Sequence, residues 1–486
     1  MGNPVLVDEA TVRGTAAEAW IWGLPMLENY RTLYARAVDD ADPRHVGGFG
    51  VFRHYPHSGT PADTDLVTPD GDTPYSLAWL DLRTEPWVLE VPAADRYHVL
   101  PLHDLDTCYV GFVGTRTTGN GAGRHLVLGP DHRGTSAEGF DGVLQADTRL
   151  VGIVGRTHLA GPEDVPALEQ VQAGYRLRPL SAHLGTEPPP PAPDPVWPVW
   201  REEVLDSLEF FSFLDFLLGF FPVLPADADL RRRLAELGVG TGDFEPAALP
   251  LEIRAAMAAG IADARTRLGA AVAGSHGSTA LFGTRAQLGT DHLGRAIGVQ
   301  RGLYGLPVEE VWYTGWTTDD GSAEEGATGD GHDAGHAEDT GHTGDTGDVD
   351  VAEDAGFDVD AEFGEFGEYG RPLDGSARSY TLRFPPGSRP PARYFWSVTV
   401  YGLPDRWLVA NPIGRYAIGD RTPGLLADED GGLTLRLRHE RPEEPGASAN
   451  WLPVPAGPFM VVLRAYGPEP TVLDGRWQRP PLIADR

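Results

Sequence analysis

Aspartates gathered in one short stretch are the residues of this sequence whose type and spacing best suit chemistry. In TPDGDTPYSLAWLDLRTEPWVLEVP, residues 68–92, Asp70 and Asp72 flank a glycine, and Asp81 follows beside Arg83. Residues two apart on an extended chain share a face, so Asp70 and Asp72 can reach one pocket. Two carboxylates with separated pKa values act as general acid and base, or as acid and nucleophile, on a glycosidic or similar bond.

A second acidic segment, YHVLPLHDLD, supplies the other candidate carboxylate, Asp104. If the end of this strand lies beside the first aspartate turn, Asp72 and Asp104 are the catalytic residues of one shared hollow. Tyr75, Arg83 and Arg116 would then bind the substrate, since arginine holds a carboxylate through two parallel hydrogen bonds. The alternative is structural, because aspartate before glycine or threonine forms turns and Asp–Arg pairs brace the corners of sheets.

The same segment raises the question of a metal. His98, Asp104 and Asp106 have the same parity along the strand and offer imidazole and carboxylate ligands to a divalent ion. A histidine side chain more often forms ordinary hydrogen bonds than binds a metal. No cofactor is therefore predicted, apart from a divalent metal at these three residues. The sequence contains no G-x-S-x-G, H-E-x-x-H or C-x-x-C pattern.

Aromatic and amide side chains recur near the C-terminus. Such groups suit recognition of a sugar ring or an apolar ligand, but they also pack the core of a β-sandwich and pin its turns. The candidate substrate-binding residues of this kind are Trp396, Asn411, Arg415, Asn450 and Trp451.

Composition excludes several classes of function. Asp and Glu outnumber basic residues 71 to 39, and the net charge is -32, so nucleic-acid and membrane partners are not expected. The sequence has no lysine, which excludes a P-loop and any Schiff-base chemistry. The single cysteine, Cys108, lies in an apolar run and is predicted to be a buried core residue.

Hydrophobic periodicity predicts the elements that position these residues. Helical spacing marks 8–38 and 163–175, whereas a period of two marks much of 74–155. A polyproline run at 188–195 precedes a helical block at 199–303. The run at 319–368 is acidic and rich in glycine, a composition that predicts disorder, and strand patterns return after it.

These patterns predict an α+β protein made of two β-sandwich-like, jelly-roll-type modules with a helical insertion and a disordered acidic loop. The predicted units are an N-terminal β-rich module with a leading helix (1–187), a proline linker with the helical block (188–318), the acidic insertion (319–370) and a C-terminal β-sandwich module (371–486).

Long collinear motifs also resemble a bacterial two-module family. The N-terminal half shows DTPYSLAWLDLRTEPWVLEVP and GRTHLAGPEDVPALEQVQAGYRLRPLS, and the C-terminal half shows FWSVTVYGLPDRWLVANPIGRYAIGD and NWLPVPAGPFMVVLRAYGPEP. They are similar to domains of unknown function twelve fifty-four and twelve fourteen, a family with no agreed activity. The resemblance implies two β-rich domains, the first carrying the helical block, and many exported relatives.

Two features depart from the family pattern. Asp70 stands where the family usually has an asparagine, which exchanges an amide for a charge and puts any role of that amide in doubt. The acidic run at 319–368 sits where relatives have a short loop, as expected of an exposed insertion.

The leading functional hypothesis is a carboxylate-assisted hydrolase or lyase that acts on a small molecule or glycan at the junction of the modules. The alternative is a non-catalytic binding or assembly protein whose polar motifs are structural. A homo-oligomer is compatible with either. The N-terminal residues show no export signal and the lone cysteine suits a reducing compartment, so a cytoplasmic location is expected.

Overall fold

The computed structural model describes residues 8–57, 59–62, 70–274, 281–316, 372–443 and 446–485. Helices and β-sheets are both present, so the predicted α+β class is confirmed. The acidic insertion predicted at 319–370 lies outside the described residues.

The first sheet is the centre of the N-terminal half. Counted over the described residues, it has five antiparallel strands in the order β1-β2-β8-β4-β5. The middle of strand β2, residues 77–80, is an unbroken apolar run, as expected where both faces of a strand are buried. Leu77 and Trp79 pack against helix α1, whereas Ala78 and Leu80 face a second sheet. The strands are β1 Arg53–His54, β2 Tyr75–Asp81, β8 Leu150–Thr157, β4 His98–Asp104 and β5 Tyr109–Gly114.

The second sheet has the order β7-β6-β3-β9 and shares a hydrophobic cluster with the first. Leu89 of β3 and Val127 of β6 contribute to that cluster. The helix predicted at 163–175 is confirmed as α2. The elements here are β3 Trp87–Val91, β6 Gly123–Leu128, β7 Gly142–Gln145, α2 Val165–Gln172, β9 Arg176–Pro179 and α3 Leu180–Leu184.

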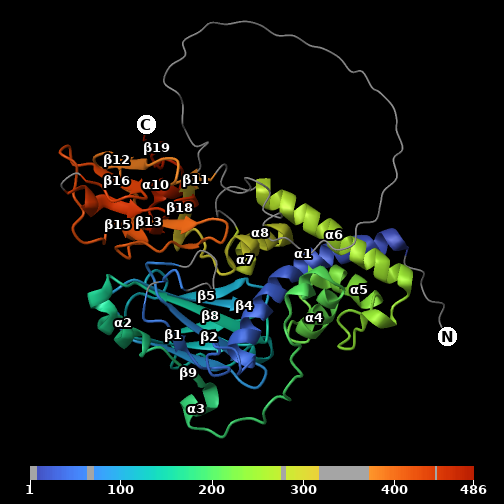
Figure 1. Cartoon of the computed structure of the whole chain (residues 1–486). Helices are drawn as coiled ribbons and strands as arrows, with labels where there is room; N and C mark the ends of the chain where they lie inside the picture. The colour runs from blue at the N-terminus through green and yellow to red at the C-terminus, as the bar shows by residue number, and fades with distance from the viewer. Residues whose placement is uncertain are drawn as a thin grey trace, which may run out of the picture.

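Helix α1 belongs to the helical block rather than to the sheets that follow it in the sequence. It is buried on most sides, with α4, α6 and α8 packed against it and the first sheet beneath (Figure 1). Gly260 of α6 permits the closest approach, since a Cβ there would lie 2.6 Å from the Arg13 carbonyl oxygen. The helices are α1 Glu9–Leu33, α4 Glu209–Leu218, α5 Ala228–Glu236, α6 Leu251–Gly274, α7 Arg285–Leu288 and α8 His292–Gly302.

Two further sheets form the C-terminal half, shown in orange and red in Figure 1. One has β10-β18-β13-β14 with β11 and β15 at its sides, and the other has β17-β16-β12-β19. Strand β10 therefore joins the C-terminal sheets although it precedes the acidic insertion. The elements are β10 Val311–Trp316, β11 Leu373–Asp374, β12 Tyr380–Phe384, β13 Ala392–Gly402, β14 Trp407–Leu408, β15 Ala417–Gly419, β16 Leu433–Arg438, β17 Trp451–Pro453, β18 Pro458–Pro468, α10 Pro470–Leu473 and β19 Leu482–Ala484.

Strand alternation gives β13 and β18 two different faces. Val398 of β13 and Leu463 of β18 point into the core between the C-terminal sheets. Their neighbours Ser397, Arg464 and Tyr466 point to the opposite face, and Ser397 is paired with Arg464 across the two strands. These three polar residues are buried, and Ser397 and Tyr466 bond to the N-terminal half.

No helix in the described parts of the chain is long and apolar enough to cross a membrane.

Candidate functional site

The turn that precedes β2 is organised by the carboxylate of Asp70. The Asp72 backbone N–H donates to Asp70 Oδ1 at 2.8 Å, and the Thr73 hydroxyl donates to Asp70 Oδ2 at 2.6 Å. Aspartate commonly bonds to the backbone two residues on, so the turn-forming interpretation of Asp70 holds. Its side chain is nevertheless buried at the boundary between the two halves of the protein.

The C-terminal half completes a cluster around both aspartates. The Tyr466 hydroxyl donates to Asp70 Oδ2 at 2.8 Å and lies 3.3 Å from Asp72 Oδ2. The Ser397 hydroxyl donates to the same Asp72 oxygen. Residues more than 300 positions apart in the sequence therefore share hydrogen bonds, and the contact joins the first sheet to the C-terminal sheets.

Two buried arginines, one from each half, bring positive charge to this junction cluster. Arg156 of β8 places one guanidinium nitrogen 3.6 Å from Asp70 Oδ2 and donates another to the Tyr304 carbonyl oxygen at 2.7 Å. Arg464 of β18 donates to the hydroxyls of Thr399 and Tyr401. The Arg156 Nε atom is buried and has no hydrogen-bond partner among the described residues.

The two aspartates differ in their electrostatics. Burial opposes ionisation of Asp70, but the charges of Arg464 and Arg156 outweigh it and hold the pKa of Asp70 below its ordinary value. Burial, reinforced by the negative charge of Asp70, raises the pKa of Asp72 to about 7. The pair therefore keeps one exchangeable proton, on Asp72, up to about pH 7.

The hypothesis that Asp72 and Asp104 share one hollow is wrong. The Leu159 N–H donates to the Asp72 carbonyl oxygen just beyond the end of β8, whereas Asp104 pairs with Val151 near the start of β8. From Val151 to Thr157, the last residue of β8, the strand advances by six residues, which is roughly 20 Å. The two carboxylates lie at opposite ends of the first sheet.

Asp104 belongs instead to a second acidic cluster, where the sheet meets the helical block. Its carboxylate accepts hydrogen bonds from the Asp147 and Thr148 backbone N–H groups and, at 2.8 Å, from the Thr148 hydroxyl. Arg285 of α7 lies 3.4 Å from it. These contacts favour the structural alternative raised for this residue.

Asp106 is the ionised member of the second cluster. Arg285 and Arg295 lie 2.7 Å and 3.0 Å from Asp106 Oδ2. Burial opposes ionisation, but these two charges hold the pKa of Asp106 well below its ordinary value. Burial and the charge of Asp106 raise the pKa of Asp104 to about 7. Cys108 is buried here beside Arg295, as predicted for a core cysteine.

The proposed metal ligands do not converge. His98 begins β4, Asp104 ends it and Asp106 lies in the following turn. Shared parity therefore places His98 and Asp104 on one face of the strand but too far apart to bind the same ion. Within the described ranges, no group of three or more His, Cys, Asp and Glu side chains is arranged to hold a metal ion.

The predicted substrate-binding residues of the N-terminal half separate into two groups. Tyr75 lies in the junction cluster, where its hydroxyl accepts the Asp70 N–H and its ring faces the Arg156 guanidinium. Arg83 pairs with its neighbour Asp81, and Arg116 pairs with the buried Glu310. These two arginines lie in ion pairs outside the junction cluster.

The C-terminal candidates support their own module. Asn411 bonds to backbone groups on both sides of its turn, and Arg415 donates to three carbonyl oxygens of the 448–451 segment. Asn450 bonds to the backbone of Leu426 and Thr434. Trp396 and Trp451 are buried in that half. A substrate-binding role for these five residues stays a prediction.

Sequence reasoning missed four members of the junction cluster, which are Arg156, Ser397, Arg464 and Tyr466. A signal was present, because LVGIVGRT, FWSVTVY and VVLRAY each place a polar side chain inside an otherwise apolar strand. A charged residue in such a position is seldom fully buried without a partner.

Fold and site together define a two-part α+β protein whose halves meet at a buried acid–arginine cluster. Family models match both halves: "Protein of unknown function (DUF1254)" matches residues 49–179, and "Protein of unknown function (DUF1214)" matches residues 364–470. The two halves of the chain therefore match the two domain models that its motifs predicted. No curated protein matches.

One solved structure supports the same architecture. The VPA0106 protein from Vibrio parahaemolyticus has 24% sequence identity and a TM-score of 0.70, over 98% of this chain and 100% of that one. An uncharacterized protein from Burkholderia cenocepacia has 12% identity and a TM-score of 0.41, over 95% of this chain and 86% of that one. The first similarity shows a common fold.

Proposed function

We propose that the junction cluster is an acid–base site for a small organic molecule or glycan, which makes the protein a carboxylate-assisted hydrolase or lyase. One observation carries the proposal. Asp70 and Asp72 are two residues apart and share the Tyr466 hydroxyl, yet their pKa values are displaced in opposite directions. Paired titratable groups whose environments separate their pKa values are typical of acid–base catalysts.

The roles follow from these environments. Asp72, with a pKa of about 7, is available both as an acid and as a base at neutral pH. As an acid it gives its proton to the leaving oxygen of the substrate, and as a base it takes one from water or from carbon. Asp70 stays ionised. Arg156 and Arg464 supply fixed positive charge for negative charge that develops on a substrate oxygen.

The sequence also predicted where such a site would lie, at the junction of two β-rich modules. We propose that each β-rich half is a sandwich-like module, and that the ligand reaches the cluster at the boundary between them. Two features favour this setting: each half has one hydrophobic cluster shared by two sheets, and Asp72 and Tyr75 keep part of their surface exposed.

Depletion of metabolites from a cell extract tests the proposal. The purified protein, its Asp72→Asn variant and its Asp104→Asn variant are incubated with the extract, and circular dichroism checks that each is folded. We expect the wild type and Asp104→Asn to consume the same compound and Asp72→Asn to leave it. Asp104→Asn is the matched control, since it removes a buried carboxyl of similar pKa outside the junction cluster. Equal depletion by all three proteins would refute the catalytic role of Asp72.

A second candidate function is non-catalytic binding or assembly. The observation that favours it is that the same hydrogen bonds join the two halves, through Ser397 and Tyr466. In that case no compound is consumed by any of the three proteins, and Asp72→Asn weakens the association of the halves instead. Limited proteolysis between the halves measures this.

A further inference from the structure

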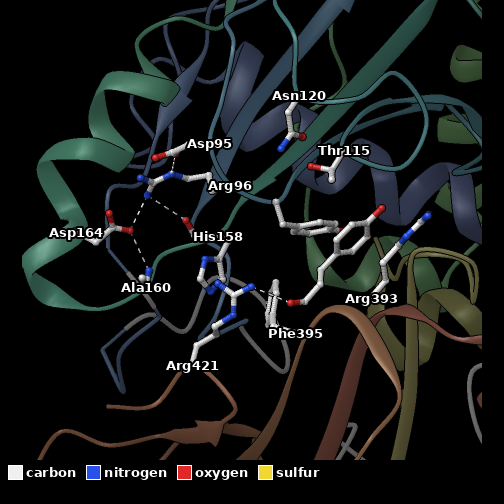
Figure 2. Close-up of a pocket in the computed structure, with 12 residues that line it drawn as sticks. Asp95, Arg96, Thr115, Asn120, His158, Ala160, Asp164, Arg393, Phe395 and Arg421 are labelled. Atoms are coloured by element: carbon white, nitrogen blue, oxygen red, sulfur yellow. Dashed lines mark hydrogen bonds and ion pairs between the residues drawn. The ribbon is translucent and has the colours of Figure 1, made fainter. Parts of the chain in front are cut away.

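A hollow of about 470 Å³ lies at the boundary between the two halves, on the outer side of the junction cluster (Figure 2). Phe395 and Tyr97 line it, and the Phe395 ring stacks on Tyr466 with centroids 4.0 Å apart. Since Tyr466 binds Asp70, one layer of aromatic rings separates the hollow from the acid–base pair.

The charges that line the hollow are unbalanced toward the positive. Arg96 is neutralised, because it lies 2.6 Å from Asp164 and 3.0 Å from Asp95. Arg393 and Arg421 form no ion pair with an acid in the described part of the chain, and Figure 2 shows both at the C-terminal side of the hollow. In a protein with a net charge of -32, this excess of arginine is local.

Two further groups in the wall lack the partners that buried polar groups normally have. The Asn120 Oδ1 atom is buried without a hydrogen-bond partner among the described residues. The His158 side chain is only 5% exposed, and its imidazole has a ring contact with Phe395 but no hydrogen bond to a described residue. Burial and the charges of Arg421 and Arg96 lower the pKa of His158 to about 4, so the imidazole is neutral at pH 7.

We propose that this hollow binds a small aromatic carboxylic acid. The carboxylate pairs with Arg421, whose planar guanidinium also donates to the Tyr394 carbonyl oxygen at 2.9 Å. The ring lies against Phe395 and the tyrosines beside it. A neutral His158 hydrogen-bonds without adding charge.

Binding in the hollow can be measured without any reaction at Asp72, because the aromatic layer separates the two sites. Isothermal titration of the whole protein with 4-hydroxybenzoate tests it, with benzoate, acetate and inorganic phosphate as comparison ligands. We expect 4-hydroxybenzoate and benzoate both to bind more tightly than acetate or phosphate.

Variants locate the binding. Arg421→Ala should weaken 4-hydroxybenzoate by about tenfold or more. The control is Arg383→Ala, an exposed arginine of the same half that pairs with Asp430 away from the hollow; it should leave affinity unchanged. Because Arg421 is exposed, its replacement should leave the fold intact.

Three results would overturn the proposal: no binding of either aromatic acid, equal affinity of Arg421→Ala and Arg383→Ala, or phosphate binding as tightly as the aromatic acids. If the protein depletes no metabolite but still binds the aromatic acids, the proposed acid–base function is refuted and the binding site in the hollow is not. If it depletes a metabolite through Asp72 but binds no aromatic acid, the binding site is refuted and the proposed function is not.

Discussion

The first sheet carries an acidic cluster at each end, and the two clusters are built from the same parts. Each has two aspartates two residues apart, one with a pKa held low by a pair of arginines and one with a pKa raised to about 7. The junction cluster joins the sheet to the C-terminal half, and the other joins it to the helical block.

The clusters differ in the surroundings of the aspartate that keeps its proton. Asp104 accepts from two backbone N–H groups and one hydroxyl of its own half, and its residue is 3% exposed. Asp72 accepts from two hydroxyls of the other half and keeps part of its surface exposed. A buried arginine Nε without a partner among the described residues occurs in both clusters, at Arg156 and at Arg295, so it does not distinguish them. A raised pKa does not by itself mark a functional site either; the partly exposed carboxyl at a boundary between the halves separates the two clusters.

The largest expected effect is the loss of Arg295, which holds the second cluster together. Arg295→Ala leaves the buried Asp106 carboxylate with one arginine in place of two, and breaking such a pair lowers the free energy of unfolding by about 3–5 kcal/mol. Urea unfolding measures it. Arg232→Ala, which breaks exposed ion pairs on α5, should change it by less than about 1 kcal/mol. Similar values for the two variants would show that Arg295 is not structural.

Within the second cluster, Asp106→Asn should destabilise more than Asp104→Asn. The first removes the ionised carboxylate that Arg285 and Arg295 both contact, at about 3 kcal/mol. The second replaces a group that is already largely protonated at pH 6.5, at about 1 kcal/mol. The same urea experiment at pH 6.5 compares them. The reverse order would mean that Asp104 holds the charge.

The pH dependence of stability should be alike at the two ends of the sheet. The folded protein keeps a proton on Asp72 up to about pH 7, whereas the unfolded chain releases it near the ordinary aspartate pKa of 3.8. The stabilisation is therefore complete below that value and is lost as pH rises toward 7, by at most about 1.4 kcal/mol per pH unit. Asp72→Asn and Asp104→Asn should each flatten this decline in unfolding experiments from pH 4 to 8. An unchanged slope in either variant would contradict the raised pKa of that residue.

The smallest effect concerns the hydroxyls that touch the protonated acids. Ser397→Ala removes a donor that favours the ionised form of Asp72, so the pKa of Asp72 should rise further while stability falls by about 1 kcal/mol or less. Thr148→Ala should raise the pKa of Asp104 and destabilise more, because Thr148 also accepts the Leu105 N–H at 3.0 Å. Carboxyl-carbon NMR titration reads both values, and a fall in either pKa would be inconsistent with this geometry.

Local patterns were enough to predict a good part of the architecture. Alternation in YTLRF and LTLRLR placed β12 and β16, helical spacing placed α1 and α2, and the two-module family was identified from its motifs. The pairing of Asp70 with Asp72 also followed from residue parity, since it involves neighbours in the chain.

The errors arose where distance along a strand mattered. His98, Asp104 and Asp106 do have the same parity, but β4 carries them to different ends of the sheet. Parity determines the face of the strand on which a side chain lies. It does not determine how far that side chain is from residues of other segments. Asp72 and Asp104 were brought together in the hypothesis by an assumed strand pairing, and the observed register of β2, β8 and β4 excludes it.

The sequence by itself determined the α+β class, the family and a turn in which one aspartate carboxylate binds the backbone of the next. Those properties depend on contacts within a few residues and on hydrophobic periodicity. Only the tertiary structure decided that Arg464 and Tyr466 lie against Asp70, 396 positions away for Tyr466, and so which carboxylate keeps its proton. The physical reason is that a pKa depends on burial and on charges brought close in space, and neither is encoded by local spacing.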